Sequence, residues 1–509
     1  MKLLLGPLLG IESDTVYTVC FVTPLDCDVA ALQLSNGDVI NASVITTMYY
    51  GKFWRAEIEL TAPAQGIVID YSIQTTSEQL IEDHNNRKAW SFYVPAKNEQ
   101  PECIYTSCNG FSSPDLINKT SDPYLLWKRI KATHEPRINS VRNNIPVIDA
   151  PYSMMMMGGD QLYADSIWND VAELKQWSAK SLQEKQAKKS SKVLQSQVAK
   201  FYEKLYFERW NQPDTSLMLA SIPTVMMWDD HDIFDGWGSY PEEIQNWGVH
   251  KTIFAQAKYY FELFQIRSLK NKALFNTKAE HYALAFTFRE NHILALDNRS
   301  QRSLKQVMSE QQWSEVVDYL KQTVNQGNLF ILSAVPVVYR DFSVAESYVD
   351  TTPWEDELAD DLKDHWRAKE HQGERARLIM NLLSNAKKRQ QQSTLNKTVI
   401  FSGDVHVGCL GVITDKTDSP VTKVHQVVSS GIVHPAPSRL AWLGIVTSTN
   451  DRDEYLNEDN SIMAKMLAPI HSDKYIRSRN YVTVSTGTDK KLWINWQTEN
   501  KDKPIYPIS

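Results

Sequence analysis

Short runs that alternate apolar and polar residues fill the first part of the chain. Alternation of this kind predicts strands with one buried face, and it occurs at residues 16–22, 53–60 and 67–73. The dipeptide Asn36-Gly37 has the composition of a tight hairpin turn. Short strands with frequent turn signals are typical of two packed antiparallel sheets. We therefore predict an antiparallel β-sandwich domain over residues 1–100, which ends at a polar, proline-bounded linker at residues 95–101.

The pattern changes after residue 100, where the apolar residues form unbroken runs. Runs of this length indicate strands that are buried on both faces, and they occur at residues 153–157, 222–227, 292–296, 329–333 and 398–401. Charged segments with helical periodicity separate the runs, at residues 166–210, 242–270, 309–326 and 355–390. Buried strands that alternate with helices predict a layered α/β domain. We assign this domain to residues 101–509, with helical excursions near 166–210 and 355–390.

Composition and charge disfavour several classes of function. The 509 residues carry 54 basic and 61 acidic side chains, a net charge of −7, which disfavours a nucleic-acid-binding or anionic-membrane-binding protein. No apolar run reaches the roughly 18 residues of a membrane-spanning helix. The apolar segment at residues 1–9 is interrupted by Gly6-Pro7 and soon followed by acids, so we expect a strand there and not a signal peptide. Five cysteines are too few for a disulfide framework, and we expect a cytoplasmic protein.

Acidic residues and histidines follow the predicted strands at the point where each strand ends. They are Asp160, Asp230, Asp404 and His406. Because ligands bind at the carboxyl ends of strands in open α/β sheets, these side chains are expected to converge from distant parts of the chain. Carboxylate oxygen and imidazole nitrogen are ligands for divalent and trivalent metal ions. The pattern therefore predicts a metal site.

Local sequence around these residues supports that prediction, with one alternative. Glycine precedes two of the acids, in Gly159-Asp160 and Gly403-Asp404, and lets the chain turn sharply there. If residues 404–406 are extended, Asp404 and His406 point to the same side. The acidic cluster at residues 229–232 is equally consistent with a helix N-cap.

Four segments together resemble one protein family. They are Gly-Gly-Asp-Gln-Leu-Tyr-Ala-Asp at 158–165, Trp-Asp-Asp-His-Asp at 228–232, Leu-Asp-Asn-Arg at 296–299 and Ser-Gly-Asp-Val-His at 402–406. In this order they resemble the PhoD-like (alkaline phosphatase D) branch of the calcineurin-like metallophosphoesterases. The resemblance implies an N-terminal β-sandwich followed by a four-layer αββα metallophosphoesterase domain. It also implies hydrolysis of a phosphoester, by a phosphatase or phosphodiesterase that uses a hydroxide activated by two metal ions.

The resemblance further implies the metal ligands. The general superfamily begins its site with an Asp-x-His motif that this sequence lacks, and PhoD-like enzymes have a cysteine there, which matches Cys108. The alternative for Cys108 is a small buried apolar residue. One metal ion would then be held by Cys108, Asp160 and His406, and the other by Asp160, Asp230 and Asp404. A thiolate–imidazole set suits iron, and the carboxylate set suits calcium, manganese, magnesium or zinc.

Two further residues are expected to act in catalysis, again by the resemblance. His231 is expected to protonate the leaving group or to bind a phosphate oxygen, with Asp229 or Asp232 orienting it. Arg299 is expected to bind phosphate through its guanidinium group, with a salt bridge to a nearby aspartate as the alternative. Tyr163 is either a metal ligand or a packing residue, and His434 follows a strand from which it can reach the site.

Two functions of other classes compete with this hypothesis. Fifteen tryptophans and many carboxylates also suit a carbohydrate-active hydrolase. A non-catalytic, metal-stabilised binding protein is the second alternative, in which the N-terminal sheets bind the partner. The histidine and cysteine beside the acids disfavour both alternatives, since neither function requires them.

Overall fold

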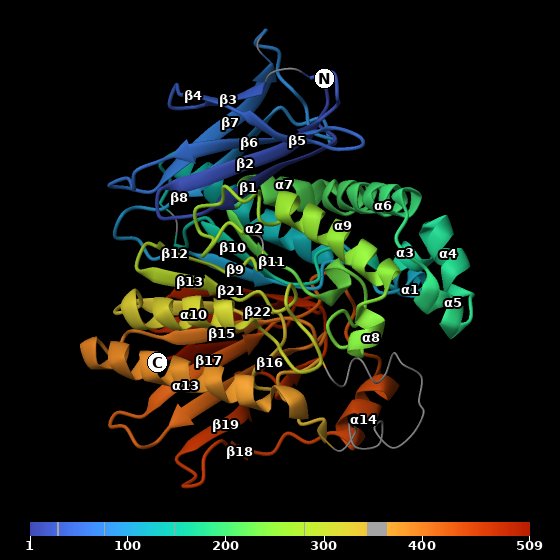
Figure 1. Cartoon of the computed structure of the whole chain (residues 1–509). Coiled ribbons are helices and arrows are strands. Elements are labelled where there is room, and N and C mark those ends of the chain that lie inside the picture. Colours follow the sequence, from blue (N-terminus) through green and yellow to red (C-terminus); the bar gives the residue numbers. More distant parts are fainter. Residues whose placement is uncertain (28–29, 76, 147, 279, 344–363) are drawn as a thin grey trace.

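The computed structural model describes residues 1–27, 30–75, 77–146, 148–278, 280–343 and 364–509. Within these residues the strands form three sheets, and helices lie between and around them (Figure 1). The two larger sheets carry the segments that hold the candidate site residues.

The largest sheet has the strand order β23-β22-β21-β9-β10-β11-β1-β2-β6-β5. Its centre is parallel and consists of β9 (Cys103–Thr106), β10 (Met154–Gly158), β11 (Thr224–Met227) and β1 (Leu5–Ile11). Antiparallel strands extend it on one side, β21 (Asn480–Thr486), β22 (Leu492–Thr498) and β23 (Ile505–Ile508). On the other side lie β2 (Val16–Thr23), β6 (Lys52–Glu59) and β5 (Ser43–Thr47).

The second large sheet has the order β12-β13-β14-β15-β17-β16-β19-β18, with β20 paired to β16. Four of its strands are parallel, β13 (Asn291–Ala295), β14 (Asn328–Leu332), β15 (Thr398–Ser402) and β17 (Thr422–Val428). Its antiparallel strands are β12 (Leu284–Phe288), β16 (Gly408–Asp415), β18 (Glu454–Tyr455), β19 (Ile462–Leu467) and β20 (Tyr475–Ile476). The strands expected from the unbroken apolar runs are therefore present, each within about two residues of its predicted bounds.

The N-terminal strands do not form a sheet system of their own. A third sheet, of β4 (Val39–Asn41), β3 (Ala30–Leu34), β7 (Ile67–Thr75) and β8 (Ala89–Val94), covers β2, because Tyr17 packs on Phe92 with ring centroids 5.3 Å apart. However, β1 pairs with β11 at Gly10 and Thr224, so one N-terminal sheet continues into the strands that carry the site. The sequence contains no local signal for this long-range pairing. The domain boundary near residue 100 stays a prediction.

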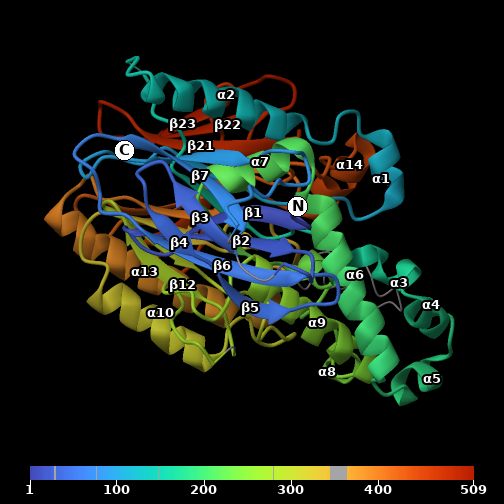
Figure 2. The ribbon, with the colours of Figure 1, turned by 90° about the horizontal axis from the view of Figure 1, so that it is seen from above.

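The helical segments are more divided than their periodicity suggested. Residues 166–210 contain α3 (Ile167–Asp170), α4 (Ala172–Ser178), α5 (Leu182–Ala187) and α6 (Lys192–Trp210), which Figure 2 shows at one side of the molecule. Ser191 begins α6 as an N-cap, since its hydroxyl accepts the Leu194 N–H at 3.0 Å. The expected helix at 355–390 is α13 (Gln372–Gln392) in the described residues, whereas 355–363 lies outside them.

The remaining helices cover the sheets or connect their strands. They are α1 (Pro114–Lys119), α2 (Leu125–Arg142), α7 (Pro213–Ser221), α8 (Glu242–Gln245), α9 (Gly248–Phe264), α10 (Glu310–Gln322) and α14 (Arg439–Ser448). The residues that α8, α9 and α10 cover lie within the helical segments predicted at 242–270 and 309–326. None of the described helices has both the length and the apolar character that crossing a membrane requires.

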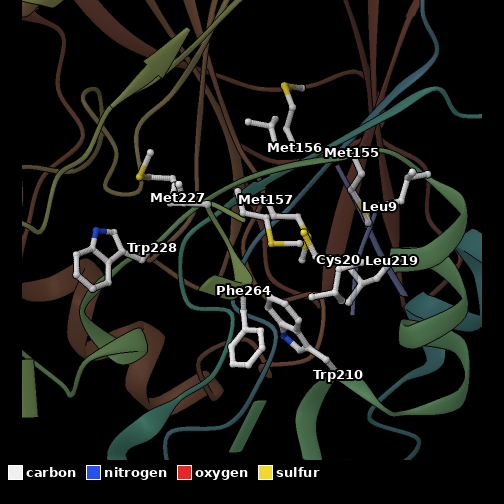
Figure 3. Close-up of a cluster of buried hydrophobic side chains, with 14 of the residues drawn as sticks. Leu9, Cys20, Met155, Met156, Met157, Trp210, Leu219, Met227, Trp228 and Phe264 are labelled. Atoms are coloured by element: carbon white, nitrogen blue, oxygen red, sulfur yellow. The ribbon is translucent and has the colours of Figure 1, made fainter. Parts of the chain in front are cut away.

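A methionine-rich core holds β10 and β11 in place. Met154–Met157 and Met226–Met227 are at most 1% exposed. Figure 3 shows methionines of both strands near Leu9, Leu219 and Phe264, which belong to β1, α7 and α9. Burial of each such side chain contributes about 1.5–3 kcal/mol to stability. Because the candidate acids follow directly after β10 and β11, this core also fixes the position of the candidate site.

Candidate metal centre

The candidate residues lie just beyond the carboxyl ends of strands from both large sheets. Cys108 follows β9, Asp160 follows β10 and Asp230 follows β11 in the first sheet. Asp404 and His406 follow β15 in the second sheet. The expected convergence at strand ends is therefore present for residues that lie up to about 300 positions apart.

Several of these residues have left-handed backbone conformations, which side chains other than glycine rarely adopt. The φ angles are 54° at Cys108, 56° at Asp160, 58° at Tyr163, 69° at Asp404 and 52° at His406. Strained residues of this kind concentrate at functional sites, where the surrounding structure holds them.

The segment 403–407 departs from the extended geometry that the sequence suggested. Residues 404–407 form successive bends, so this segment is not extended, and the argument that Asp404 and His406 point the same way along a strand does not apply. Gly403 does not supply a left-handed turn. Instead, a Cβ atom at this position would lie 2.3 Å from the Ser107 hydroxyl, so glycine allows β9 and β15 to approach closely. Gly159, by contrast, has a φ of 99°.

Cys108, Asp160 and His406 form a compact group. One potential ligand atom of each lies within 4.8 Å of the others, and the Cys108 Sγ is 3.4 Å from Asp160 Oδ2. Burial, together with the Asp160 carboxylate, raises the pKa of the Cys108 thiol well above its usual value. Without a cation the thiol therefore stays protonated, whereas a bound metal ion would favour the thiolate.

Tyr163 belongs to the same group. Its hydroxyl lies 2.9 Å from His406 Nε2, and the Tyr163 ring stacks with both His231 and His434, at centroid distances of 4.5 and 5.2 Å. His434 in turn stacks on His406 at 3.7 Å. His434, which was expected to reach the site from the end of a strand, therefore lies beside Tyr163 and His406. Tyr163 contacts three histidines of the site, and its role as a metal ligand stays a prediction.

A second, acidic group adjoins the first through Asp160. Ligand atoms of Asp160, Asp229 and Asp230 lie within 4.8 Å of one another, as do those of Asp230, His231 and Asp235. Asp404 belongs to neither of these trios among the described residues. It is nevertheless close enough for Asp229 and Asp230 to raise its pKa, after burial, which is the largest cause.

His231 is oriented by a residue other than the expected one. Its Nδ1 lies 2.9 Å from Asp165 Oδ2, and Asp165 Oδ1 accepts the backbone N–H of Asp235 at 2.9 Å. Burial lowers the pKa of His231, but Asp165 and Asp230 outweigh burial and raise it well above its usual value. Asp229 and Asp232, the candidates from the sequence, have other partners. Asp232 accepts the backbone N–H groups of Gln161 and Asp229 at 2.8 and 3.0 Å.

Arg299 lies at the centre of a buried ion-pair network. It is fully buried, and its five N–H groups all have acceptors: Asp229 Oδ1, Asp230 Oδ1 at 3.4 Å, both Asp364 oxygens and the Trp237 carbonyl at 2.9 Å. This is the salt-bridge alternative that the sequence left open. The role of Arg299 in phosphate binding stays a prediction.

The charge balance of the site suits metal ions. Asp160 Oδ1 and Asp229 Oδ2 are buried and have no hydrogen-bond partner among the described residues. Burial and repulsion from Asp229 raise the pKa of Asp160 well above its usual value, and burial raises that of Asp229 to about 7 despite the neighbouring Arg299. Buried carboxylates that lack compensating charge are costly unless a cation binds them. The donors that are present fit a thiolate–phenol–imidazole–carboxylate site beside a carboxylate site.

Sequence analysis did not identify three residues that lie at the site, Asp165, Asp364 and Ser430. Asp165 lies in the motif at residues 158–165, and its position five residues after Asp160 could have indicated that it lies at the site. Asp364 and Ser430 carried no local signal. Ser430 Oγ lies 3.0 Å from the Cys108 sulfur and accepts the His406 backbone N–H at 2.8 Å.

A family model and a curated relative each match part of the chain. Residues 147–356 match the family model described as PhoD related phosphatase. The chain is 26% identical over 420 residues to the "Uncharacterized protein YGR266W" of Saccharomyces cerevisiae. That alignment covers 70% of this chain and 56% of the yeast protein, so the chain spans little more than half the length of this curated relative.

Two solved structures share the fold. PhoD is similar with a TM-score of 0.59 and 14% identity, and the match covers 99% of this chain and 88% of PhoD. Purple acid phosphatase PPD1 from yellow lupin (Lupinus luteus) seeds is similar with a TM-score of 0.51 and 11% identity, and the match covers 99% of this chain and 74% of PPD1. Residues 147–356 are thus similar to PhoD related phosphatases, and the chain shares its fold with PhoD and with a purple acid phosphatase.

Proposed function

We propose that this protein hydrolyses phosphate esters in a metal-dependent reaction. The observation that carries the proposal is the group formed by Cys108, Asp160 and His406, in which a thiol, a carboxylate and an imidazole meet within 4.8 Å. A buried carboxylate oxygen of Asp160 without a partner supports a cation at this position. Similarity of residues 147–356 to the family model of PhoD related phosphatases supports a phosphoester as the substrate.

Two metal ions are part of the proposal. Cys108, Asp160 and His406 would hold the first, with the Tyr163 hydroxyl as a fourth donor, and this set suits iron. Asp160, Asp230 and Asp404 would hold the second, and their carboxylates suit calcium, or manganese, magnesium or zinc. When bound, such ions polarise the phosphate oxygens and make a water molecule more acidic.

The protein's own groups then have distinct tasks. His231, held at Nδ1 by Asp165, would deliver a proton from Nε2 to the leaving-group oxygen or donate a hydrogen bond to phosphate. Asp165 is a positioning residue, because it acts through His231. Arg299 would balance the charge of Asp229 and Asp230, and we keep phosphate binding by Arg299 as a secondary hypothesis because all its donors are occupied.

Finer features of the fold and location also belong to the proposal. The contact between Tyr105 of β9 and Phe401 of β15, with centroids 5.4 Å apart, supports two sheets packed face to face at the centre of an αββα domain. The packing of Tyr17 on Phe92 supports an N-terminal sandwich. Cys20, Cys103, Cys108 and Cys409 are buried and form no disulfide, which supports a reducing, cytoplasmic location.

The test compares native protein with Asp160→Asn. Both proteins are assayed on p-nitrophenyl phosphate and bis-p-nitrophenyl phosphate, and metal content is measured by mass spectrometry. Asp160→Asn removes the carboxylate shared by both candidate sites, so turnover and bound metal should be lost together. Removal of metal from the native protein should abolish turnover, and the metal ions should restore it.

Asp170→Asn is the matched control, since it makes the same chemical change at an exposed helix end. It should keep native activity and metal content. Metal-replete protein that hydrolyses no phosphoester, or an Asp160→Asn variant with near-native turnover, would contradict the proposal. Turnover of a glycoside that survives metal removal would instead support the carbohydrate-active alternative.

A further inference from the structure

A second candidate binding site lies at the opposite ends of the strands that carry the metal centre. A cleft of about 390 Å³ lies where β15 and β17 begin, and four lysines line it, Lys397, Lys423, Lys490 and Lys491. Figure 1 shows the C-terminus, whose Ser509 also lines the cleft, on the side of the molecule away from α14.

The cleft is separate from the candidate metal centre. Lys397 precedes the first residue of β15, whereas Asp404 and His406 follow its last residue. The five residues of β15 span about 13 Å at the usual rise of a strand. A ligand in the cleft therefore cannot touch the groups that hold the metal ions.

Positive charge exceeds negative charge in the cleft. Four lysines line the cleft, whereas Asp489 is its one acidic side chain among the lining residues. Lys491 Nζ lies 3.6 Å from Asp489 Oδ2, and Lys397 Nζ donates to the Thr394 carbonyl at 2.6 Å. Lys423 and Lys490 have no ion-pair partner among the described residues. Two cations of the cleft are thus left without compensating charge.

A buried histidine adds a donor to the same surface. His425 of β17 lines the cleft and is 5% exposed, and its imidazole ring has no hydrogen-bond partner among the described residues. Burial, with the charges of Lys423 and Lys397, lowers the pKa of His425 to about 3, so its ring is neutral and carries one N–H. Burial and the charge of Lys423 also lower the pKa of Lys397. A bound anion would relieve this crowding of positive charge.

We propose that this cleft binds a small phosphate-bearing anion, held by Lys397, Lys423 and Lys490 with His425 at its floor. Several ammonium groups around one concavity complement an anion with more than one charge, and lysine is a common phosphate ligand. The cleft is several times larger than one phosphate group, which leaves room for an organic substituent. The proposal does not depend on catalysis at the metal centre.

Residue-resolved lysine labelling tests the proposal on the native protein. The chain is acetylated briefly with an N-hydroxysuccinimide ester, with inorganic phosphate or with sodium chloride at equal ionic strength, and each lysine is quantified by peptide mass spectrometry. At a phosphate concentration ten times the dissociation constant, acetylation of Lys423 and Lys490 should fall about tenfold. The exposed lysines Lys189 and Lys305 should not change. Protection that is absent, or equal in chloride, would overturn the proposal.

A double variant provides the second measurement. Lys423→Glu with Lys490→Glu reverses two exposed charges of the cleft, and should weaken protection of Lys397 by phosphate at least about tenfold. Lys189→Glu with Lys305→Glu changes the net charge equally and should leave that protection as in the native protein. Phosphate protection of Lys397 that persists unchanged in the cleft variant would contradict the assignment. Thermal unfolding of both variants checks that each is folded.

Discussion

Asp165 offers a sharp test of how His231 acts, because it touches the imidazole without belonging to a candidate metal trio among the described residues. Its Oδ2 lies 2.9 Å from His231 Nδ1, and both side chains are 14% exposed. Asp165→Asn preserves the size of the side chain but removes its charge. If the amide oxygen keeps the Asp235 N–H, the amide nitrogen faces Nδ1 and the imidazolium loses its partner.

The size of the effect follows from the geometry. Opposite unit charges about 4 Å apart attract by about 4 kcal/mol at an effective dielectric constant of about 20. That energy corresponds to about a thousandfold change in the protonation equilibrium of His231. The value lies within the roughly 10²–10⁴-fold that general acid catalysis contributes. We therefore expect Asp165→Asn to lower kcat on phenyl phosphate about a thousandfold.

Leaving-group dependence separates this role from a structural one. The loss should be much smaller on p-nitrophenyl phosphate, because nitrophenolate leaves with little need of a proton. Metal content, measured in parallel, should remain native, and Asp170→Asn should behave as the native protein on both substrates. An equal loss on both substrates, or a loss of metal, would refute the assignment of His231 as proton donor and of Asp165 as its positioning residue.

Three further predictions concern the metal site and stability. Cys108→Ser should lose the metal of the Cys108–Asp160–His406 group together with any visible absorption band, whereas Cys103→Ser should keep both, as metal analysis and spectroscopy will show. Arg299→Met removes the counter-charge of the buried Asp229 and Asp230, whereas Asp364 keeps its ion pair with Arg302. The variant should lower the free energy of unfolding in urea by about 3–5 kcal/mol; native-like stability would contradict this. Burial lowers the pKa of His134 to about 3. Below pH 6.5 this histidine is therefore protonated in the unfolded chain and neutral in the folded chain. When the pH falls from 8 to 5, the free energy of unfolding of His134→Phe should therefore decrease by about 2 kcal/mol less than that of the native protein. Urea unfolding at both pH values measures this, and an equal decrease in the two proteins would contradict the prediction.

The strands and the general position of the site could be predicted because their signals are local. An unbroken apolar run such as Met154–Met157 is favourable only when it is buried on both faces, and all four side chains are buried in the structure. The continuation of the N-terminal strands into the large sheet could not be predicted. It depends on the pairing of Gly10 with Thr224, which are more than 200 positions apart, and no residue pattern specifies that partner.

The geometry of the site could not be predicted as well from the sequence, because loops that follow different strands determine it together. The left-handed conformation of Cys108 costs roughly 1–3 kcal/mol, and nothing in the sequence around it favours that conformation. It is held from outside, since the Cys108 N–H donates to the Gly159 carbonyl at 3.2 Å and the Cys108 carbonyl accepts the His434 N–H at 3.1 Å. The Asp160 carbonyl likewise accepts the Asn109 N–H at 2.7 Å. These bonds join the loops after β9 and β10 to the segment after β17, so each loop holds the strained conformation of another. The motifs identify which residues meet, whereas only the assembled sheets determine how they face one another.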